Sequence, residues 1–390
     1  MISKKRMLGC ALAIFWGGAV SFGYPGVMTL YWQERFGVGA GDVQAVTTFM
    51  LLALAASMFF SGRIHQKIGI FYCFLIGTVL YAATFLTALL ATRIEHIYLW
   101  GLFANLSLSF IYGPGLTTCQ TAVPEKRGLV SGVLNLVFGL AAAVTSPLMN
   151  AVLSHLGERA LNGMLLAVIL LTDVAALLLV RGDTPVYQSA SKTESRTADH
   201  SVSQALHSRL FRLMWLVWAF VGAAGITMIS LSKTYSVAVG IAGVTVLTAF
   251  NLANGGIRIA AGALSDRIGG TATALLFYSL ATVALFVFPF VRSTLAVCLC
   301  AAAVGMAFGT LFTVSGPILS GTFGVKNFGA IYGLVFTGYG VVGAFLGPAV
   351  VGRLLDGDPE NFVSVFWYLG AICALGTFCM LRLHVCNRRN

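Results

Sequence analysis

The sequence predicts an all-α membrane protein in which twelve transmembrane helices form two pseudo-symmetric six-helix bundles. Three observations lead to this prediction: the composition, a series of long apolar stretches, and motifs of the first half that recur in the second. The composition is 58% hydrophobic and 9% charged, with a mean hydropathy of +0.89. Soluble domains carry about 25% charged residues, so this composition by itself indicates an integral membrane protein.

Apolar stretches of about 20 residues are long enough to cross a bilayer as helices. They cover residues 7–32, 43–61, 70–91, 96–122, 128–154, 162–180, 210–234, 237–264, 270–291, 294–322, 328–354 and 362–383. The first stretch follows Lys4, Lys5 and Arg6, as the apolar region of a signal peptide would. It is too long for such a region, and no small-x-small cleavage site follows it. We therefore interpret it as the first membrane span.

Residues 181–208 form the only long polar segment, which is rich in Ser and Thr and carries charges of both signs. A segment of this composition cannot bury enough apolar surface to fold. We predict a flexible cytoplasmic linker at 181–208. It separates an N-terminal six-helix bundle at 1–180 from a C-terminal six-helix bundle at 209–390.

The net charge of +11 is explained by membrane topology and not by a nucleic-acid partner, because cytoplasmic loops of membrane proteins are enriched in Lys and Arg. We expect both termini to be cytoplasmic and the protein to be a multi-pass protein of the cell (inner) membrane, embedded in the lipid bilayer. With this orientation Arg258 lies inside the membrane, and the Lys and Arg residues of the outer side are Arg35, Arg93, Arg159, Lys233, Arg292 and Arg353.

Cysteine spacing and catalytic motifs give no sign of a cofactor or an enzyme. The eight cysteines lie in predicted spans or in the C-terminal tail, and the sequence has no C-x-x-C motif. We therefore expect no disulfide, no metal site and no cofactor. The sequence also has no H-E-x-x-H motif, no Walker loop and no grouped Ser, His and Asp residues, so we do not predict an enzyme.

The two halves are related in sequence. Gly62-Arg-Ile-His-Gln-Lys67-Ile-Gly69 recurs as Gly262-Ala-Leu-Ser-Asp266-Arg267-Ile-Gly269. Gly128, Gly132, Gly139 and Pro147 likewise match Gly329, Gly333, Gly340 and Pro348, at nearly the same shift. Parallel repeats of six helices place a substrate site between the halves, near the middle of the membrane.

Arg258 lies within the eighth predicted span, where a guanidinium costs at least ~2.5–3.5 kcal/mol. Asn251, Asn254 and Arg258 are spaced i, i+3 and i+7, so they share one helix face. An Arg fork binds a carboxylate through two parallel hydrogen bonds, which predicts an anionic substrate. The structural alternative is an ion pair between Arg258 and another helix; away from the span ends, the only other charge in a span is Asp173.

The repeated G-x-x-x-D-R-x-G loop resembles the signature loop of the major facilitator superfamily. The second copy has the motif in full, whereas the first has Gln66-Lys67 where Asp-Arg is usual. In that family the loop braces the helix bundles at the cytoplasmic gate. The resemblance therefore implies gate roles for Gly62, Lys67, Gly262, Asp266, Arg267 and Gly269; the alternative is an ordinary short charged loop.

Further motifs resemble those of the monocarboxylate transporters and the bacterial oxalate/formate exchangers, over essentially the whole chain. They are Ser21-Phe22-Gly23-Tyr24-Pro25, Asn254-Gly-Gly-Ile-Arg258, Ala307-Phe308-Gly309 and Gly352-Arg353-Leu354-x-Asp356. The expected substrate-binding residues are Arg258, Asn254, Tyr112, Phe308, Tyr339, Tyr332 and Tyr24. The tyrosines could instead be interfacial anchors or packing residues, and Phe308 could be an ordinary core residue.

Tyr339 bears on the charge of the substrate. By the match of Tyr332-Gly-Leu-Val-Phe-Thr-Gly-Tyr339, the oxalate exchangers have a lysine at this position, which gives them two cations for a dianion. One cation in this chain favours a small monocarboxylate such as L-lactate or pyruvate. A compact aromatic site also suits a small organic acid.

Coupling to protons is implied by the resemblance more than by the residues. The animal carriers use an Asp in the eighth span and a Lys in the first, where this chain has Asn254 and Gly26. The candidates for proton coupling are Asn254, Arg258 and Asp173; Asp173 could instead serve packing. Exchange without net proton movement stays open.

The predicted function is secondary active transport of small monocarboxylates, by proton-coupled symport and alternating access, in a monomer or weak oligomer. One alternative is an anion exchanger for formate, oxalate or other small organic acids. Another is a non-transporting membrane sensor, which would need a signalling domain or a long tail.

Overall fold

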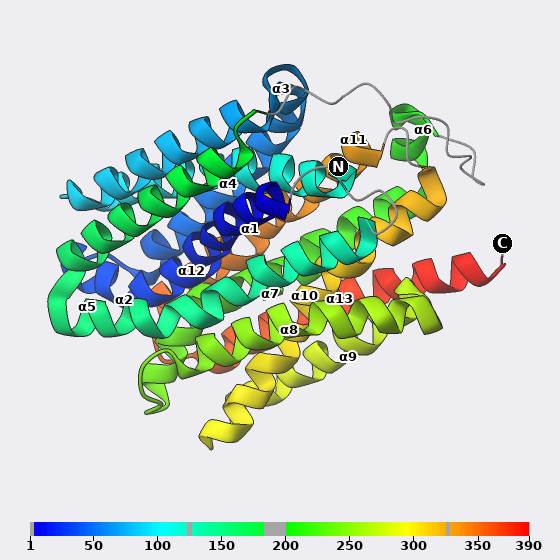
Figure 1. Cartoon of the computed structure of the whole chain (residues 1–390). Helices are drawn as coiled ribbons and strands as arrows, with labels where there is room; N and C mark the ends of the chain where they lie inside the picture. Colours follow the sequence, from blue (N-terminus) through cyan, green and yellow to red (C-terminus); the bar gives the residue numbers. More distant parts are fainter. Residues whose placement is uncertain (1–3, 123–126, 183–199, 325–327, 390) are drawn as a thin grey trace.

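The computed structural model describes residues 4–122, 127–182, 200–324 and 328–389. Within these ranges the side chains of residues 59, 63, 66, 120–122, 127–129, 131, 328–330 and 387–389 are excluded from the description. Helices make up nearly all of the described chain, and they run roughly alongside one another in one bundle (Figure 1).

The first half begins with α1 (Lys4–Gly18), a π-helical turn (Ala19–Gly23) and α2 (Tyr24–Phe36), which together make one crossing. It continues with α3 (Ala40–Leu89), α4 (Ile94–Ala122) and α5 (Arg127–Val180). The backbone leaves the helical conformation inside α3 at Gly69 and inside α5 at Gly157. Each of these long helices therefore contains two crossings.

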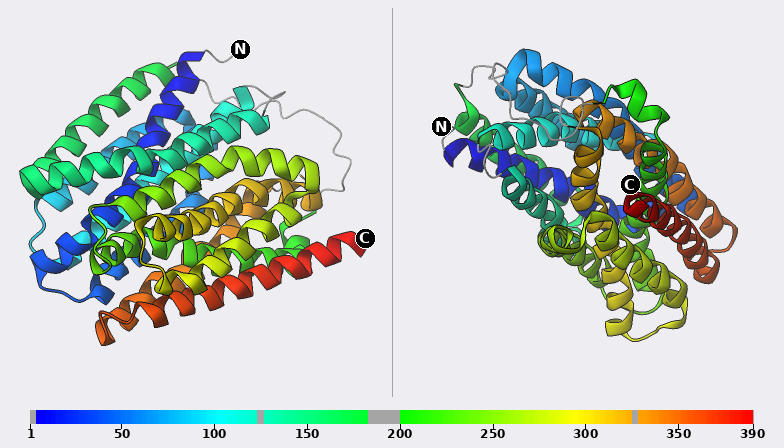
Figure 2. Two further views of the ribbon diagram at one scale, coloured as in Figure 1. Left: turned by 90° about the horizontal axis from the view of Figure 1, so that it is seen from below. Right: turned by 90° about the vertical axis from the view of Figure 1, so that its right-hand side faces the viewer.

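The second half follows a short helix and repeats this plan. Its elements are α6 (Val202–His207), α7 (Arg209–Ala238), α8 (Thr245–Ile268), α9 (Gly270–Val287) with a 3-10 turn (Phe288–Phe290), α10 (Thr294–Phe323), α11 (Phe328–Thr337), two π-helical turns (Gly338–Gly343 and Phe345–Ala349), α12 (Val350–Gly357) and α13 (Phe362–Arg389). The segments from α11 to α12 form a single crossing. The two halves lie side by side in both views of Figure 2.

The predicted fold of twelve crossings is confirmed. Ten helical stretches of the described residues are long and apolar enough to span a membrane. One of these, Gly132–Val180, contains the break at Gly157 and accounts for two crossings. The remaining crossing is α8, which is not among the ten and which carries Asn251, Asn254 and Arg258 in its middle.

The predicted start of the eighth span, at residue 237, is wrong. The preceding helix α7 runs to Ala238, and α8 begins at Thr245. Between them Gly240 and Gly243 have positive φ angles of 72° and 65°. The apolar composition of residues 237–244 concealed a turn that these glycines form.

The predicted linker at 181–208 lies mostly outside the described residues. Its described end includes the short helix α6, which begins with a capping box. Ser201 accepts a hydrogen bond from the Gln204 backbone N–H, and the Gln204 side chain accepts one from the Ser201 N–H. This part of the segment is therefore helical and not extended coil.

An even number of crossings returns the chain to the side on which it began. Both termini accordingly lie toward one end of the bundle, on the right in Figure 1. We call this the terminal end. The opposite end, where α2 ends at Phe36 and α12 ends at Gly357, is the distal end.

Large apolar side chains cover the outer surface of the bundle, as a lipid environment requires. Exposed examples occur on both halves and include Leu148, Leu171, Leu276, Val283, Leu299 and Phe378. A groove of about 480 Å³ on this surface lies between α9 and α13 and is lined mainly by such residues. The chain is thus a multi-pass membrane protein with an apolar exterior.

Gly69 and Gly269 end the two copies of the repeated loop with the same unusual backbone. Their φ and ψ angles are 80° and 175° at Gly69, and 87° and 149° at Gly269. Residues with side chains rarely adopt this region, so the last glycine of each motif copy is required by the backbone. Gly262 differs, because it lies inside α8 and a Cβ there would meet only Thr313, at 3.7 Å.

We expect Gly269→Ala to destabilise the protein by about 1–3 kcal/mol, the usual cost of holding a side-chain residue in a sparsely populated backbone region. The matched control is Gly262→Ala, which should be neutral or slightly stabilising because Ala is the better helix former. Thermal unfolding of both purified variants in detergent, followed by tryptophan fluorescence, measures the difference. Equal melting temperatures would show that the backbone at Gly269 imposes no such requirement.

Candidate functional site

Arg258 lies on α8, where this helix meets α5 of the other half. Its side chain is only 1% exposed. The two helices touch through glycines: a Cβ built on Gly139 would lie 2.8 Å from the Cα of Gly255 and 3.0 Å from Nε of Arg258. The guanidinium is therefore held at the contact between the two halves.

The hydrogen-bond partners of Arg258 are neutral. Nη1 donates to Oδ1 of Asn135 at 3.1 Å, Nη2 to Oδ1 of Asn254 at 3.4 Å, and Nε to the Asn254 backbone oxygen at 3.3 Å. The rings of Phe312 and Phe138 lie 5.0 and 5.9 Å from Cζ, within cation–π range. None of the partners that the described residues provide is a carboxylate.

Asn135 is the main site residue that the sequence did not predict. Its Oδ1 also accepts a hydrogen bond from the Tyr112 hydroxyl, at 2.5 Å, so one amide oxygen joins Tyr112 to Arg258. A signal was present, because Asn135 is an amide within an apolar span and lies one helical turn before Gly139. An amide at that spacing from an interface glycine lies on the interface side of its helix.

The predicted aromatic residues of the second half come together beside Arg258. Phe308 is fully buried, and its ring centroid lies 5.2 Å from that of Phe312 and 6.1 Å from that of Tyr339. Tyr332 and Tyr339 both pack edge-on against Trp218, each at 5.9 Å. Phe312, whose ring packs against those of Phe308 and Tyr339, also lies 5.0 Å from Cζ of Arg258.

Several buried polar atoms of α8 and α10 have no hydrogen-bond partner among the described residues. They are the hydroxyl of Thr248, both amide atoms of Asn251, Nδ2 of Asn254 and the hydroxyl of Thr310. Asn251 and Asn254 are fully buried and lie on the same α8 face as Arg258. A buried polar group left unpaired costs about 1–3 kcal/mol, so this face is suited to a ligand with polar atoms of its own.

Tyr24 lies in a different cluster from Arg258. Its hydroxyl donates to Asn162 at 2.5 Å, and its ring stacks on Trp100 at 4.8 Å. The π-helical turn before Tyr24 changes which residues face the other half. Phe22, inside that turn, lies 5.7 Å from Phe308 of the second half.

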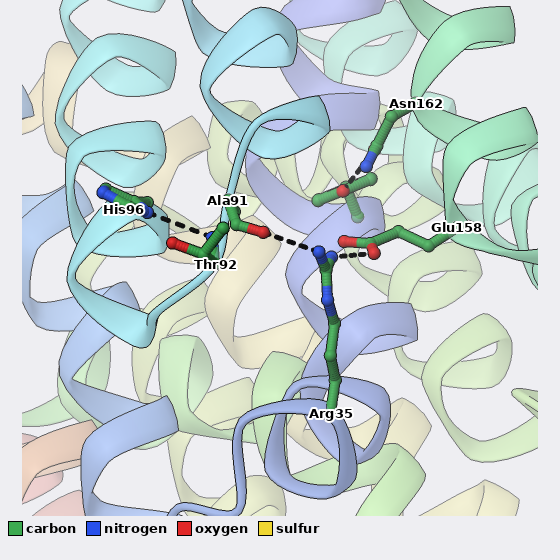
Figure 3. Close-up of polar contacts among 7 residues, drawn as sticks. Arg35, Ala91, Thr92, His96, Glu158 and Asn162 are labelled. Atoms are coloured by element: carbon green, nitrogen blue, oxygen red, sulfur yellow. Dashed lines mark hydrogen bonds and ion pairs between the residues drawn. The ribbon is translucent and has the colours of Figure 1, made fainter.

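A polar network at the distal end joins three helices of the first half. Arg35 pairs with Glu158 and donates through Nη2 to the Ala91 carbonyl at 2.6 Å (Figure 3). Arg35 therefore connects the end of α2 to the α3–α4 loop and to α5. Asn162, the partner of Tyr24, lies one helical turn beyond Glu158 (Figure 3).

Asp173 is buried within the first half and is not the counter-ion of Arg258 in this structure. It is 1% exposed, and its Oδ2 accepts a hydrogen bond from the Thr78 hydroxyl at 3.2 Å. Asp173 belongs to α5 and Thr78 to α3, so both residues lie in the N-terminal bundle. The structure thus separates this proton-coupling candidate from the other two, Asn254 and Arg258.

The signature-loop residues lie beyond Arg258, toward the terminal end. Asp266 and Arg267 in the last turn of α8 are exposed, as is Lys67 of the first copy. Gly62 is inside α3, where a Cβ would meet nothing within 4 Å. The side chain of Gln66 lies outside the described part of the chain.

Hydrogen bonds between the halves close the distal side of the site. They are Gly41 N to both Asp356 carboxylate oxygens (2.9 and 3.0 Å), Ser230 to Gln44 (2.5 Å), Thr48 to the Ala344 carbonyl (3.2 Å) and Lys233 to the Val27 carbonyl (2.6 Å). Gln44 and Ser230 are almost completely buried, whereas Tyr112, Asn135 and Tyr332 retain partial exposure. This structure is therefore closed at the distal end.

Comparisons with known proteins agree with this arrangement. The family model described as "Major Facilitator Superfamily" matches residues 7–296 and 225–389. The "Oxalate:formate antiporter" of Oxalobacter formigenes is 24% identical over 263 residues, which cover 66% of this chain and 62% of the antiporter. "Uncharacterized MFS-type transporter YhjX" of Escherichia coli (strain K12) is 22% identical over 306 residues, 74% of this chain and 73% of that protein. "Monocarboxylate transporter 3" of Mus musculus is 27% identical over 142 residues, 35% of this chain and 27% of that protein.

Proposed function

Because the chain belongs to the major facilitator superfamily, we propose that it is a secondary active transporter of small monocarboxylates and that Arg258 binds the substrate carboxylate. One observation carries this proposal. A buried guanidinium lies at the contact between the halves, and the described residues surround it with amide oxygens, a backbone oxygen and aromatic rings. A carboxylate would supply the missing negative charge and form two charge-assisted hydrogen bonds with the Arg fork.

The charge around the site supports a monoanion. Tyr112 is joined to Arg258 through Asn135, and Tyr339 lies in the aromatic cluster beside Arg258; these phenols carry no positive charge. Lys233, a partly buried cation of the second half, donates to the Val27 carbonyl on the distal side. One cation at the site therefore balances one carboxylate.

The unpaired amides of α8 support a substrate with a second polar group. Asn251 has a free donor and a free acceptor, one helical turn from Asn254. A hydroxyl or keto oxygen next to the carboxylate would occupy this position, while Phe308 and Phe312 would contact the apolar carbon atoms. The proposed substrates are therefore short 2-hydroxy or 2-oxo acids such as L-lactate and pyruvate.

The mechanism that we propose is alternating access. Arg258 comes from the second half and Tyr112 from the first, so a carboxylate between them would connect both halves. Once loaded, the halves would rock about the site, breaking the distal hydrogen bonds and opening that end. Exposed Asp266, Arg267 and Lys67, with the backbone turns at Gly69 and Gly269, would brace the terminal end as it closes.

Proton-coupled symport is the proposed form of transport, and exchange is the second candidate. Symport follows the resemblance to monocarboxylate transporters, with Asp173, Asn254 or Arg258 involved in coupling. Exchange is favoured by the absence of a carboxylate partner for Arg258 among the described residues. A transporter with a fixed buried cation and no counter-ion resists changing conformation when no anion is bound. Each return step would therefore require an anion.

Uptake of labelled L-lactate into proteoliposomes tests the proposal. Symport predicts that an inward proton gradient stimulates initial uptake several-fold and that a protonophore removes the stimulation. Exchange predicts stimulation only when the vesicles are preloaded with an unlabelled anion. Protein-free vesicles measure leakage of the neutral acid. No saturable uptake of lactate, pyruvate, formate or oxalate under either condition would contradict the proposed substrate class.

Tyr339→Lys should improve the handling of dicarboxylates. The new ammonium would lie in the aromatic cluster beside Arg258 and provide a second cation for a second carboxylate. We expect the preference for oxalate over lactate, measured by competition for labelled lactate, to rise by about tenfold, equivalent to ~1.4 kcal/mol. Tyr339→Phe is the control and should leave the preference unchanged. An unaltered preference in Tyr339→Lys would show that the number of cations does not set selectivity.

A further inference from the structure

Asn135 holds the two donors that a substrate carboxylate would use. Its Oδ1 accepts from Nη1 of Arg258 at 3.1 Å and from the Tyr112 hydroxyl at 2.5 Å. A carboxylate oxygen has two lone pairs and accepts two hydrogen bonds in the same way. We propose that the Asn135 side chain is an internal substitute for the substrate carboxylate, which displaces it on binding. This inference rests on the proposed function and goes further by naming a residue that sets affinity.

The substrate carboxylate is a stronger acceptor than the Asn135 amide oxygen, which favours displacement of Asn135 from Arg258. A carboxylate bound to an Arg fork forms charge-assisted hydrogen bonds that are about twice as strong as neutral ones. Asn254 supplies a second amide oxygen, to Nη2, so both terminal nitrogens of Arg258 donate to neutral oxygens in this structure. A substrate with one carboxylate can replace both contacts.

The positions of Asn135 and Arg258 connect the displacement of Asn135 to the movement of the two halves. Asn135 belongs to α5 and Arg258 to α8, on opposite sides of the contact between the halves. In this structure their hydrogen bond joins the halves directly. With substrate bound, the connection passes through the carboxylate. Asn135 therefore competes with the substrate for the residue on which binding depends.

The chain offers a matched control in the second crossing of α5, just beyond the break at Gly157. The Asn162 Oδ1 also accepts a tyrosine hydroxyl at 2.5 Å, from Tyr24, and Asn162 is likewise on α5. Its partners are away from Arg258. Asn162→Ala removes a similar Tyr–Asn hydrogen bond without affecting the guanidinium.

Two substitutions of Asn135 test the proposal in purified protein. Asn135→Asp fixes a carboxylate beside Arg258, so the melting temperature without ligand should rise by several degrees. Binding of labelled L-lactate should then weaken at least about a hundredfold, because the internal ion pair must be broken first. Asn135→Ala removes the competitor, and lactate binding should become about tenfold tighter, the scale of one hydrogen bond to a charged group. Asn162→Ala should bind lactate as the unmodified protein does.

The outcomes separate this inference from the proposed function. If the unmodified protein binds no monocarboxylate, the substrate proposal fails, and the melting temperature of Asn135→Asp alone decides the inference. A rise supports an internal acceptor for Arg258; no rise overturns it. If lactate binds, the inference is overturned when Asn135→Asp retains normal affinity or when Asn135→Ala binds no more tightly than Asn162→Ala.

Discussion

Arg258→Gln is expected to abolish saturable uptake of labelled monocarboxylate while the protein remains folded. The substitution removes the cation but keeps a polar side chain that can still contact Asn135 and Asn254. Loss of one member of a buried, hydrogen-bonded charge pair costs about 2–5 kcal/mol, so binding should weaken by at least ~30-fold. Thermal stability should be unchanged or higher, because the variant no longer buries an uncompensated charge in the membrane.

Binding and stability are measured together for this variant. Lactate affinity comes from an equilibrium binding assay and the melting temperature from tryptophan fluorescence. The matched control is Arg292→Gln, since the Arg292 guanidinium donates to the Pro289 carbonyl outside the site. Arg258→Lys separates the effect of charge from that of shape, because it keeps the cation but loses the planar fork. Its lactate affinity should lie between that of the unmodified protein and that of Arg258→Gln. Normal affinity in Arg258→Gln would refute the central role of this residue.

Gly255→Ala should disrupt transport even though it adds only one methyl group. A Cβ on Gly255 would lie 2.7 Å from the backbone N of Leu140 and 2.6 Å from its Cδ2. The backbone atom cannot rotate away, so α5 and α8 must separate, and Arg258 loses its position relative to Asn135. Overpacking of this kind costs about 1–3 kcal/mol. We expect the initial uptake rate to fall at least about tenfold.

The adjacent Gly256 provides the control for this prediction. A Cβ there would meet nothing within 4 Å, so Gly256→Ala should retain uptake and gain slightly in helix stability. Both variants have the same composition and differ by one position on the same helix. Similar uptake by the two would mean that the close contact between α5 and α8 is not required for transport.

The fold was predictable from the sequence because membrane crossings depend on length and apolarity, which composition reveals directly. The repeated loop was also predictable, and the matching backbone angles of Gly69 and Gly269 give its last glycine a physical reason. The helix boundaries inside apolar stretches were not predictable. The turn at Gly240 and Gly243 has apolar neighbours, so hydropathy could not separate α7 from α8.

The sequence signal for the candidate site is strongest on the helix that carries a charge. Arg258 and Asn254 stand out because polar residues are costly at membrane depth. Asn135 gives a weaker signal, since an uncharged amide in a span can satisfy itself in many ways. The prediction of Tyr24 came from the motif Ser21–Pro25, which does not reveal the π-helical turn at Ala19–Gly23 just before it.

The hydrogen bonds that close the distal end set the energy scale of the transport cycle. A neutral hydrogen bond contributes about 0.5–1.5 kcal/mol net and one to a charged group about 1.5–3 kcal/mol, so the distal set amounts to several kcal/mol. Shifting a two-state population from about 1:99 to 99:1 takes ~5.5 kcal/mol. The free energy of the distal hydrogen bonds and the free energy of this population shift are thus of similar size. In the proposed cycle the closed end would therefore dominate at rest, and the binding energy of one small anion would suffice to reverse the populations.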